Sequence, residues 1–404
     1  MRFILILLLS ITALTAGDDW NYDNDHEYVK VPFNLGLWPG ISIGDMLHDE
    51  TGKKVYNNGF SLSLIGMRAQ RLKGADISGI FSIYTEGVQG FQGSGIFNIV
   101  NGNVRGFQGA GIFNLSNGNI SGFQGSGIFN MQNGDFRGFQ GTGIFTMQNG
   151  NFQGVQINGI FSMRNGNFKG FQSNGVFGIQ NGDFRGLQIS EIFNIANGNF
   201  DGAQFGGIVN ILNGSFNGLQ VGMINIMRHF DSGLQIGLVN IAEDHNGVPI
   251  GFFTWVANVP LGYQIYYDDM QFANFTVRSG NENWYNQFTL GRRLDGDVRY
   301  HTIGGGFGRK IFLGGNFGLD AGVSGAVLLD DNFKHNKDLG AITRLNLLFH
   351  FALPYEGSIF AGPVIHAWYS KLANEDLSGK LWVEETKDDY ILRVWPGFVV
   401  GIML

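Results

Sequence analysis

The chain has 404 residues and a formal net charge of −7, and 64 of its residues are glycine while only 7 are proline. Collagen is excluded because glycine does not recur at every third position, and an aromatic content of 14% offers too much apolar surface for a disordered chain. The acidic balance, without a basic patch of interleaved aromatic residues, gives no reason to expect a nucleic-acid partner.

Residues 1–17, MRFILILLLSITALTAG, have the pattern of a secretory signal peptide. Arg2 supplies a basic start, an apolar run follows to Leu14, and small residues end the segment. The chain contains no cysteine, which excludes disulfides, thiolate metal sites and the lipid-anchored type of signal. No later apolar run is long enough for a transmembrane helix, so embedding in a membrane would require β-strands. These features favour export to a bacterial envelope.

Residues 18–73 form an N-terminal segment that precedes any regular repetition. The segment opens with the polar, acidic run DDWNYDNDHEYVK. The stretches 31–44 and 57–69 then have β-type composition and are separated by a polar turn, so we predict two β-rich stretches.

Residues 74–246 repeat with a period of sixteen residues in about eleven units. Asp76 stands in the first unit where the later units have glutamine, and Gln235 ends the series after a shortened unit of fifteen residues. The glutamines that mark the regular period are Gln92, Gln108, Gln124, Gln140, Gln156, Gln172, Gln188, Gln204 and Gln220.

Each unit carries the same distribution of residue types. In residues 91–106, Ile96-Phe97, Ile99 and Val104 represent three recurring apolar sites, which we expect to pack in the interior. The pair Asn101-Gly102 marks a turn because both residues accept positive φ. The position of Arg105 changes freely between units, so it is expected to face solvent.

Two all-β arrangements fit the repeats, because one glycine in a helix interior costs about 1 kcal/mol and every unit has several. In a β-solenoid each residue stacks on its equivalent, and the Gln92 and Asn98 series become ladders of buried amides. In the alternative, each unit is one strand of a large up-and-down β-barrel. Identical hairpins accumulate no stagger, however, and outer-membrane barrels have short turns at one end and longer loops at the other. The solenoid is therefore the favoured prediction.

Residues 247–404 lose the period and form an antiparallel β-rich region, either a meander or a barrel. Long β-type stretches rich in Trp, Tyr and Gly resemble strands of outer-membrane barrels. The chain ends in GIML rather than in the aromatic residue expected at the end of a bacterial barrel. A sheet that caps the solenoid is the other interpretation, and the sequence leaves both open.

The unit G-x-Q-x-x-G-I-F-N-x-x-N-G, together with GLQIGLVNIA and GVPIGFF, resembles bacterial exported surface-repeat proteins of the spirochaete and Bacteroidetes type. The resemblance covers most of the chain after the predicted signal. It implies a location in the cell envelope, but it brings no activity and no binding residue with it. Unlike some such proteins, this chain lacks a lipidation cysteine.

The sequence contains no recognisable constellation for catalysis or for binding a cofactor. GGGFGRK (304–310) lacks a Ser or Thr after Lys310, and no Gly-x-Ser-x-Gly motif occurs. Asn-Gly-Asp at 133–135 and 181–183 suggests calcium less than turn chemistry, because most units have Asn instead of Asp. None of the eight histidines forms a ligand pair: His26, His48, His229, His245, His301, His335, His350 and His366. We predict no catalytic, cofactor-binding or metal-binding residue.

The chain is therefore expected to be a non-enzymatic envelope or surface protein with a scaffold or adhesive role. Its expected location is the outer membrane or cell surface of a bacterium, and its partner there, protein or polysaccharide, is unknown. The alternative is an outer-membrane β-barrel that could form a pore, based on the aromatic β-stretches after residue 247.

Overall fold

The computed structural model describes residues 27–46, 54–294, 299–334, 339–354, 357–371, 381–387 and 390–404. The predicted signal peptide, residues 1–17, lies outside the described residues. Contacts within the chain separate one unit that ends at Gly214 from a second that begins at Ser215. The predicted fold class is confirmed, because a parallel β-solenoid of about 12 turns precedes a closed antiparallel barrel of eight strands.

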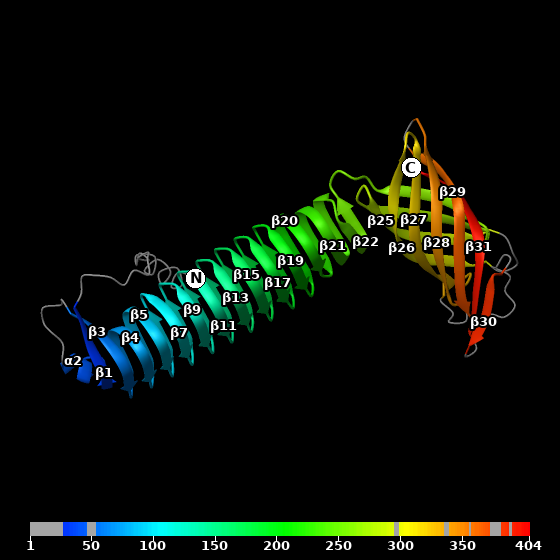
Figure 1. Ribbon diagram of the computed structural model, residues 1–404. Coiled ribbons are helices and arrows are strands. Elements are labelled where there is room, and N and C mark those ends of the chain that lie inside the picture. The colour runs from blue at the N-terminus through cyan, green and yellow to red at the C-terminus, as the bar shows by residue number, and fades with distance from the viewer. Residues whose placement is uncertain are drawn as a thin grey trace. The chain divides into compact units, whose positions relative to one another are not determined.

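The first unit consists of stacked strands and one short helix. Figure 1 shows the strands from β5 to β19 lying one behind another. The elements are β1 (Glu27–Trp38), β2 (Ile41–Ser42), α2 (Ile43–Met46), β3 (Lys54–Ser63), β4 (Gly66–Ser78), β5 (Phe81–Ser94), β6 (Phe97–Val100), β7 (Asn103–Ala110), β8 (Phe113–Ser116), β9 (Ile120–Ser126), β10 (Phe129–Gln132), β11 (Phe136–Thr142), β12 (Phe145–Gln148), β13 (Phe152–Asn158), β14 (Phe161–Arg164), β15 (Phe168–Asn174), β16 (Phe177–Gln180), β17 (Phe184–Ser190), β18 (Phe193–Ala196), β19 (Phe200–Gly206) and β20 (Val209–Val221), which runs on into the second unit.

A regular coil contains one strand of seven residues and one of four, such as β11 and β12. β11 pairs in parallel with β9 and β13, and β12 pairs in parallel with β10 and β14. Each residue lies opposite its equivalents, so that Gln140 is the partner of both Gln124 and Gln156. Parallel pairing excludes the alternative of one large up-and-down barrel, in which neighbouring strands would be antiparallel.

Three bends close each coil. Two of them, at the Asn-Gly pair and at the glycine before Ile96 and its equivalents, were predicted from the sequence. The third lies at the glycine after Arg105 and its equivalents, for example Gly138 with a φ of 135°. A Cβ atom at Gly138 would lie 1.9 Å from the carbonyl oxygen of Gly122 in the neighbouring coil, so only glycine fits.

Buried amides line the coil interior, as predicted. From Gln108 to Gln204, each glutamine of the series donates a hydrogen bond to the glutamine of the preceding coil, as Gln140 Nε2 does to Gln124 Oε1 at 2.7 Å. A second ladder contains Asn114, whose Nδ2 donates to Asn130 Oδ1 at 2.9 Å. The predicted third apolar site is also buried, and its phenylalanine rings stack 4.6–5.0 Å apart from Phe136 to Phe200.

The other two apolar sites lie on the outside, which corrects the prediction that they pack in the interior. Ile96 is 37% exposed, and Phe97 and Ile99 are half-buried. The reason is the alternation of a β-strand, in which successive side chains point to opposite faces. Because Asn98 points inward to join its ladder, both of its neighbours must point outward. Arg105 is exposed, as predicted.

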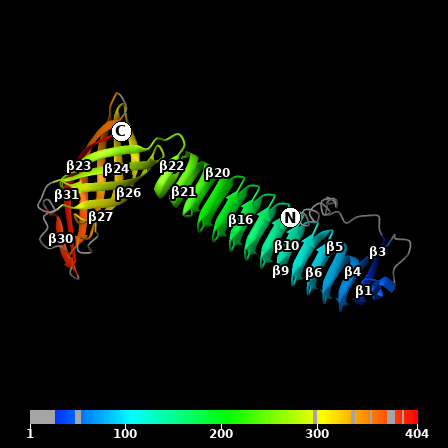
Figure 2. The same ribbon diagram turned by 180° about the vertical axis from the view of Figure 1, so that it is seen from behind.

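The second unit contains the last coils and the barrel. Figure 2 shows the barrel from behind, with β23 and β31 adjacent. After β20 the elements are β21 (Ile224–His245), β22 (Val248–Val256), β23 (Gly262–Asp268), β24 (Phe272–Gly280), β25 (Trp284–Arg293), β26 (His301–Gly314), β27 (Phe317–Leu329), β28 (Ala341–Ala352), β29 (Ser358–Ser370), β30 (Val383–Lys387) and β31 (Tyr390–Met403). Pairing of β31 with both β29 and β23 closes the barrel, and β30 forms a hairpin with the first part of β31.

The last coil rests on the outer wall of the barrel. Asn286 of β25 accepts a hydrogen bond from the backbone of Gly251 at 2.9 Å and donates one to Thr254 Oγ1 at 2.9 Å. Ser279 of β24 accepts from the backbone N–H of Thr254 at 3.1 Å. The barrel therefore also covers the final coil. For residues 247–404 the sequence left open a barrel and a sheet that caps the solenoid, and this region is a barrel that also caps the last coil.

Candidate functional site: the barrel wall and the ends of the buried ladders

Outward-pointing side chains of the barrel are predominantly apolar. β29 alternates without a break: Ile359, Pro363, Ile365 and Tyr369 are exposed, Ala361 and Ala367 are half-buried, and the residues between these are buried. The same alternation runs around the barrel. The exposed large apolar residues of the other strands are Tyr263, Ile265, Tyr267, Phe275, Leu290, Ile303, Ile311, Phe312, Leu313, Phe317, Val323, Val327, Leu345, Leu347, Phe349, Phe351, Val383, Phe398, Val400 and Ile402.

Inward-pointing side chains include ion pairs that join strands across the interior. Asp320 of β27 accepts a hydrogen bond from Arg278 of β24 and lies 2.8 Å from Nε2 of His350 of β28. Asp268, at the end of β23, lies 3.2 Å from a guanidinium nitrogen of Arg344 of β28. All five side chains are buried. Charges that are shielded inside a wall of apolar side chains reverse the usual distribution of a soluble protein.

Apolar side chains fill much of the remaining interior. One cluster contains Phe272, Leu328, Ile342, Trp368 and Trp395 together with residues near the longer connections. A second cluster lies among strands β28, β29 and β31 and consists of Leu348, Phe360, Val364 and Val399. A barrel of eight strands is just wide enough for its side chains to fill it. The described interior is therefore a packed core.

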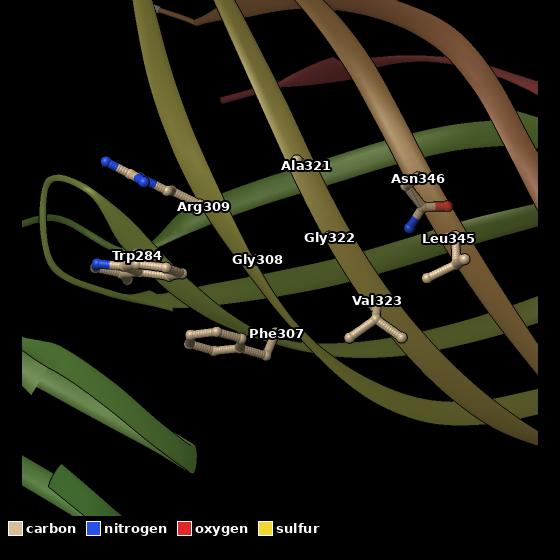
Figure 3. A pocket seen from close by; sticks show the side chains of 9 residues that line it. All are labelled: Trp284, Phe307, Gly308, Arg309, Ala321, Gly322, Val323, Leu345 and Asn346. Carbon is tan, nitrogen blue, oxygen red and sulfur yellow. The ribbon is translucent and has the colours of Figure 1, made fainter. Parts of the chain in front are cut away.

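A shallow hollow of about 380 Å³ opens on the barrel wall at β25 to β28 (Figure 3). The rings of Trp284 and Phe307 stack with centroids 5.2 Å apart, and the Arg309 guanidinium lies 5.3 Å from the Trp284 ring. Val323 and Leu345 line the side away from them. An apolar hollow with one cation and one tryptophan at its margin suits an acyl chain with its headgroup nearby.

The glutamine ladder has a carboxylate near its first coil. Gln92 Nε2 donates to Ser82 Oγ at 2.9 Å, and Ser82 Oγ donates in turn to Asp76. Burial raises the pKa of Asp76 to about 6, although hydrogen bonds from Ser82 and Ser78 oppose the shift. The glutamines donate their hydrogen bonds towards the first coil. A carboxylate, which only accepts hydrogen bonds, therefore suits this end of the series.

In the second unit, His245 contacts the last glutamine of the series. His245 Nε2 lies 3.1 Å from Gln235 Oε1, and Asn281 Nδ2 of the barrel donates to the other ring nitrogen of His245 at 3.2 Å. Gln235 uses its Oε1 as an acceptor, so the histidine must carry its proton on Nε2. Burial lowers the pKa of His245 to about 4. A protonated ring would turn an N–H towards the NH₂ group of Asn281, so the geometry requires the neutral form.

One coil contains a fully buried arginine. The Arg164 guanidinium carbon lies 4.5 Å from the ring centres of both Phe152 and Phe168, and Nη2 donates to Gln156 Oε1 at 2.7 Å. Its Nε and Nη1 have no hydrogen-bond partner. The equivalent residues of the two adjacent coils are Gln148 and Gln180. Burial lowers the pKa of Arg164 well below its usual range.

The interpretation of the Asn-Gly-Asp sequences as turns is confirmed. Asp135 accepts the backbone N–H of Asn151 at 2.8 Å, and Asp183 accepts that of Asn199 at 2.9 Å. GGGFGRK lies in β26, as a glycine-rich strand. The interior ion pairs, by contrast, were not predicted. Their only signal was the regular spacing of polar residues in ITRLNLLFHF. Arg344 and His350 fall on one face there, and the opposite face contains Leu345, Leu347, Phe349 and Phe351.

Within the described ranges, no group of three or more His, Asp or Glu side chains could hold a metal ion. The same part of the chain contains no helix of the length and hydropathy that a membrane span requires. In comparisons with known proteins, the chain matches no protein-family model, no curated protein and no solved structure.

Proposed function

We propose that this protein is an outer-membrane β-barrel protein whose barrel anchors the β-solenoid, with a structural and non-enzymatic role. The observation that supports the proposal is the reversed polarity of the barrel, with apolar side chains outside and ion pairs inside. In water, an apolar belt that surrounds a whole barrel would far exceed the few hundred Å² of apolar patch usual for a monomer. In a bilayer the same belt faces hydrocarbon, while the closed barrel satisfies its backbone hydrogen bonds internally.

The filled interior argues against the pore that we considered from the sequence. The ion pairs of Arg278 with Asp320 and of Arg344 with Asp268 cross the space that a channel would need. We therefore expect the reconstituted protein to give no stable single-channel conductance in planar bilayers. Regular conductance steps would contradict this expectation and restore the pore hypothesis.

The connections between strands suggest which side of the membrane the solenoid faces. Three short connections, 281–283, 315–316 and 353–357, lie at the end of the barrel where β23 begins and β31 ends. The opposite end has the longer connections 294–300, 330–340 and 371–389, and one short connection at 269–271. Outer-membrane barrels turn short connections to the periplasm and long ones to the exterior. The solenoid, which enters at the short-connection end, would then face the periplasm and act as a scaffold there rather than as an adhesin.

Membrane insertion is tested with a matched pair of arginine substitutions in the full chain. Leu347→Arg places a charge in the middle of the apolar belt, and Leu294→Arg makes the same exchange at the end with long connections, where Leu294 is 65% exposed. An arginine at the membrane midplane costs about 2–4 kcal/mol, falling to about 0–1 kcal/mol near the interfaces. We expect only Leu347→Arg to reduce the heat-modifiable, membrane-extracted form. A parent chain that is monomeric and soluble without detergent would refute the proposal.

Sidedness is tested by cysteine labelling, which the cysteine-free sequence makes simple. Asp331→Cys lies in a long connection, and Lys169→Cys lies on the exposed side of a coil. A membrane-impermeant maleimide should label Asp331→Cys on intact cells, and should label Lys169→Cys only after the outer membrane is opened. The reverse pattern would place the solenoid on the cell surface while leaving the membrane anchor in place.

A further inference from the structure

Three apolar rows run along one edge of the solenoid, at and beside the glycine–isoleucine bend. We call them together the apolar edge. The row at the bend contains Ile80, Ile96, Ile112, Ile128, Ile144, Ile160, Val176, Ile192, Ile208, Met223, Leu238 and Phe252. The second row contains Phe81, Phe97, Phe113, Phe129, Phe145, Phe161, Phe177, Phe193, Val209, Ile224, Val239 and Phe253. The third row contains Ile83, Ile99, Leu115, Met131, Met147, Met163, Ile179, Ile195, Ile211, Ile226, Ile241 and Trp255.

All twelve coils contribute apolar residues to each row, and no charged residue interrupts them. Exposed charge near the bend is limited to Glu191, which replaces the glycine before Ile192. The charges gather on the other side of the glycine bend that follows Arg105 and its equivalents. There the exposed row contains Lys73, Arg105, Arg137, Lys169, Arg185 and one acid, Asp201. The exposed acids Asp135 and Asp183 lie two residues before Arg137 and Arg185, and Arg185 pairs with Asp201 at 3.2 Å, so the charges beside this bend are mixed in sign. The solenoid is thus amphipathic, with an apolar edge next to a face of mixed charge.

From Ile80 to Phe193 the first two rows of the apolar edge repeat nearly the same side chains, with Val176 the one exception, so a shift of one coil reproduces nearly the same contacts. In residues 81–177 the second row is phenylalanine throughout, with rings 4.6–6.0 Å apart. A specific protein interface needs anchor residues that fix one register. This surface fixes none along its length. A fluid layer of lipid acyl chains requires no register, and its polar headgroups would lie beside the neighbouring face of mixed charge.

Within the second unit the apolar edge adjoins the barrel wall. The exposed fraction at the bend is 48% for Met223, 55% for Leu238 and 61% for Phe252. The ring of Phe252 lies 5.4 Å from that of Phe288, an outward residue of β25. Trp255 is the only tryptophan of the three rows, and tryptophan is enriched where a membrane meets water. The coil nearest the barrel therefore has the composition of a membrane interface.

We propose that the apolar edge of the solenoid binds the surface of the membrane that holds the barrel. The isoleucine and phenylalanine rows enter the boundary between headgroups and acyl chains, while the buried amides stay sealed within the coils. The occupant is a phospholipid layer. This inference rests on the proposed function, because the barrel supplies the membrane to which the solenoid is tethered.

The test uses the full chain reconstituted in vesicles of phosphatidylethanolamine and phosphatidylglycerol with brominated acyl chains. Three single-cysteine variants carry a polarity-sensitive fluorophore: Ile144→Cys on the apolar edge, Gln153→Cys on the exposed polar side of the same coil, and Leu347→Cys on the barrel belt. We expect the fluorophores at positions 144 and 347 to shift to the blue and lose most of their emission in brominated lipid. The fluorophore at position 153 should do neither.

The three positions distinguish the two proposals. Quenching at 347 without quenching at 144 would overturn the membrane-bound edge and leave the barrel anchor intact. Absence of quenching at 347 would mean that the barrel is not embedded, so that both proposals fail. Energy transfer between labels at position 144 on different chains, in place of quenching, would assign the edge to a second copy of the protein and overturn the lipid assignment.

Discussion

Replacing Arg164 by glutamine should stabilise its coil. The guanidinium is fully buried, two of its nitrogen atoms (Nε and Nη1) lack a hydrogen-bond partner, and each such unsatisfied group costs about 1–3 kcal/mol. The contacts with Phe152 and Phe168 recover about 0.5–2 kcal/mol each. Glutamine fits this row because Gln148 of the adjacent coil donates to backbone oxygens of Gly134 and Asn151 at 3.4 and 3.2 Å. The Oε1 atoms of Gln148 and Gln180 lack a partner, so the exchange should leave one unsatisfied atom in place of two and also remove a buried charge. The balance favours Arg164→Gln by on the order of 2 kcal/mol.

Hydrogen exchange followed by mass spectrometry measures this local effect in the intact protein. A gain of about 2 kcal/mol slows exchange about 30-fold in peptides covering residues 161–180, since each 1.4 kcal/mol corresponds to a factor of ten. Arg137→Gln removes the same charge from an exposed position and should change exchange by less than about 0.5 kcal/mol. If hydrogen exchange in residues 161–180 of Arg164→Gln is as fast as in the parent protein, or faster, the buried arginine does not destabilise its coil and the reasoning is refuted.

Three further outcomes are expected from the coils. Burial raises the pKa of Asp76 from 3.8 to about 6, so the coil that contains it should be most stable below pH 4 and should lose about 3 kcal/mol of unfolding free energy as the pH rises to 6. Asp76→Gln should abolish this pH dependence, as measured by hydrogen exchange corrected for the intrinsic exchange rates. Burial lowers the pKa of His245 from 6.5 to about 4, so the last coils should lose about 3 kcal/mol as the pH falls from 6.5 to 4, and unchanged protection over that interval would contradict the neutral histidine. Gly138→Ala should destabilise its coil by more than about 2 kcal/mol, because the new Cβ atom would meet a backbone oxygen. Gly141→Ala should be tolerated, because its Cβ atom would meet only the Phe139 ring, at 3.2 Å. Thermal unfolding followed by circular dichroism can compare the two variants.

The period of sixteen residues was enough to predict the solenoid, because stacking in register explains why Gln recurs without a slip. The side of the strand that faces inward was predicted wrongly for two of the three apolar sites. Phe97 and Ile99 alternate with Asn98 and Val100, and a shift of one residue exchanges the two faces. The prediction assumed that the more apolar face of the strand points inward. It was wrong here because hydrogen-bonded amides line this part of the interior.

The barrel interior could be predicted only in part. Alternation in ITRLNLLFHF separates Arg344 and His350 from Leu345 and Leu347, but the sequence does not say which face meets lipid. The pairing of Arg344 with Asp268 joins β28 to β23, which are not neighbours in the sheet. Such a contact exists only once the barrel has closed, and no local pattern encodes it.

A stack of parallel coils is in principle an open-ended polymer, because each end exposes unpaired strand edges and half-satisfied amides to which another chain could add. Here both ends are terminated. At the first coil β2 and α2 follow β1, and Gly44 donates its backbone N–H to Asn34 at 3.0 Å. At the last coil Asn281 and Asn286 of the barrel donate hydrogen bonds to the backbone carbonyls of His245, Gly247 and Pro249 and to the hydroxyl of Thr254. The barrel is therefore also the stop that fixes the length of the rod, so a chain truncated before residue 262 would present a growing end and should assemble into fibres.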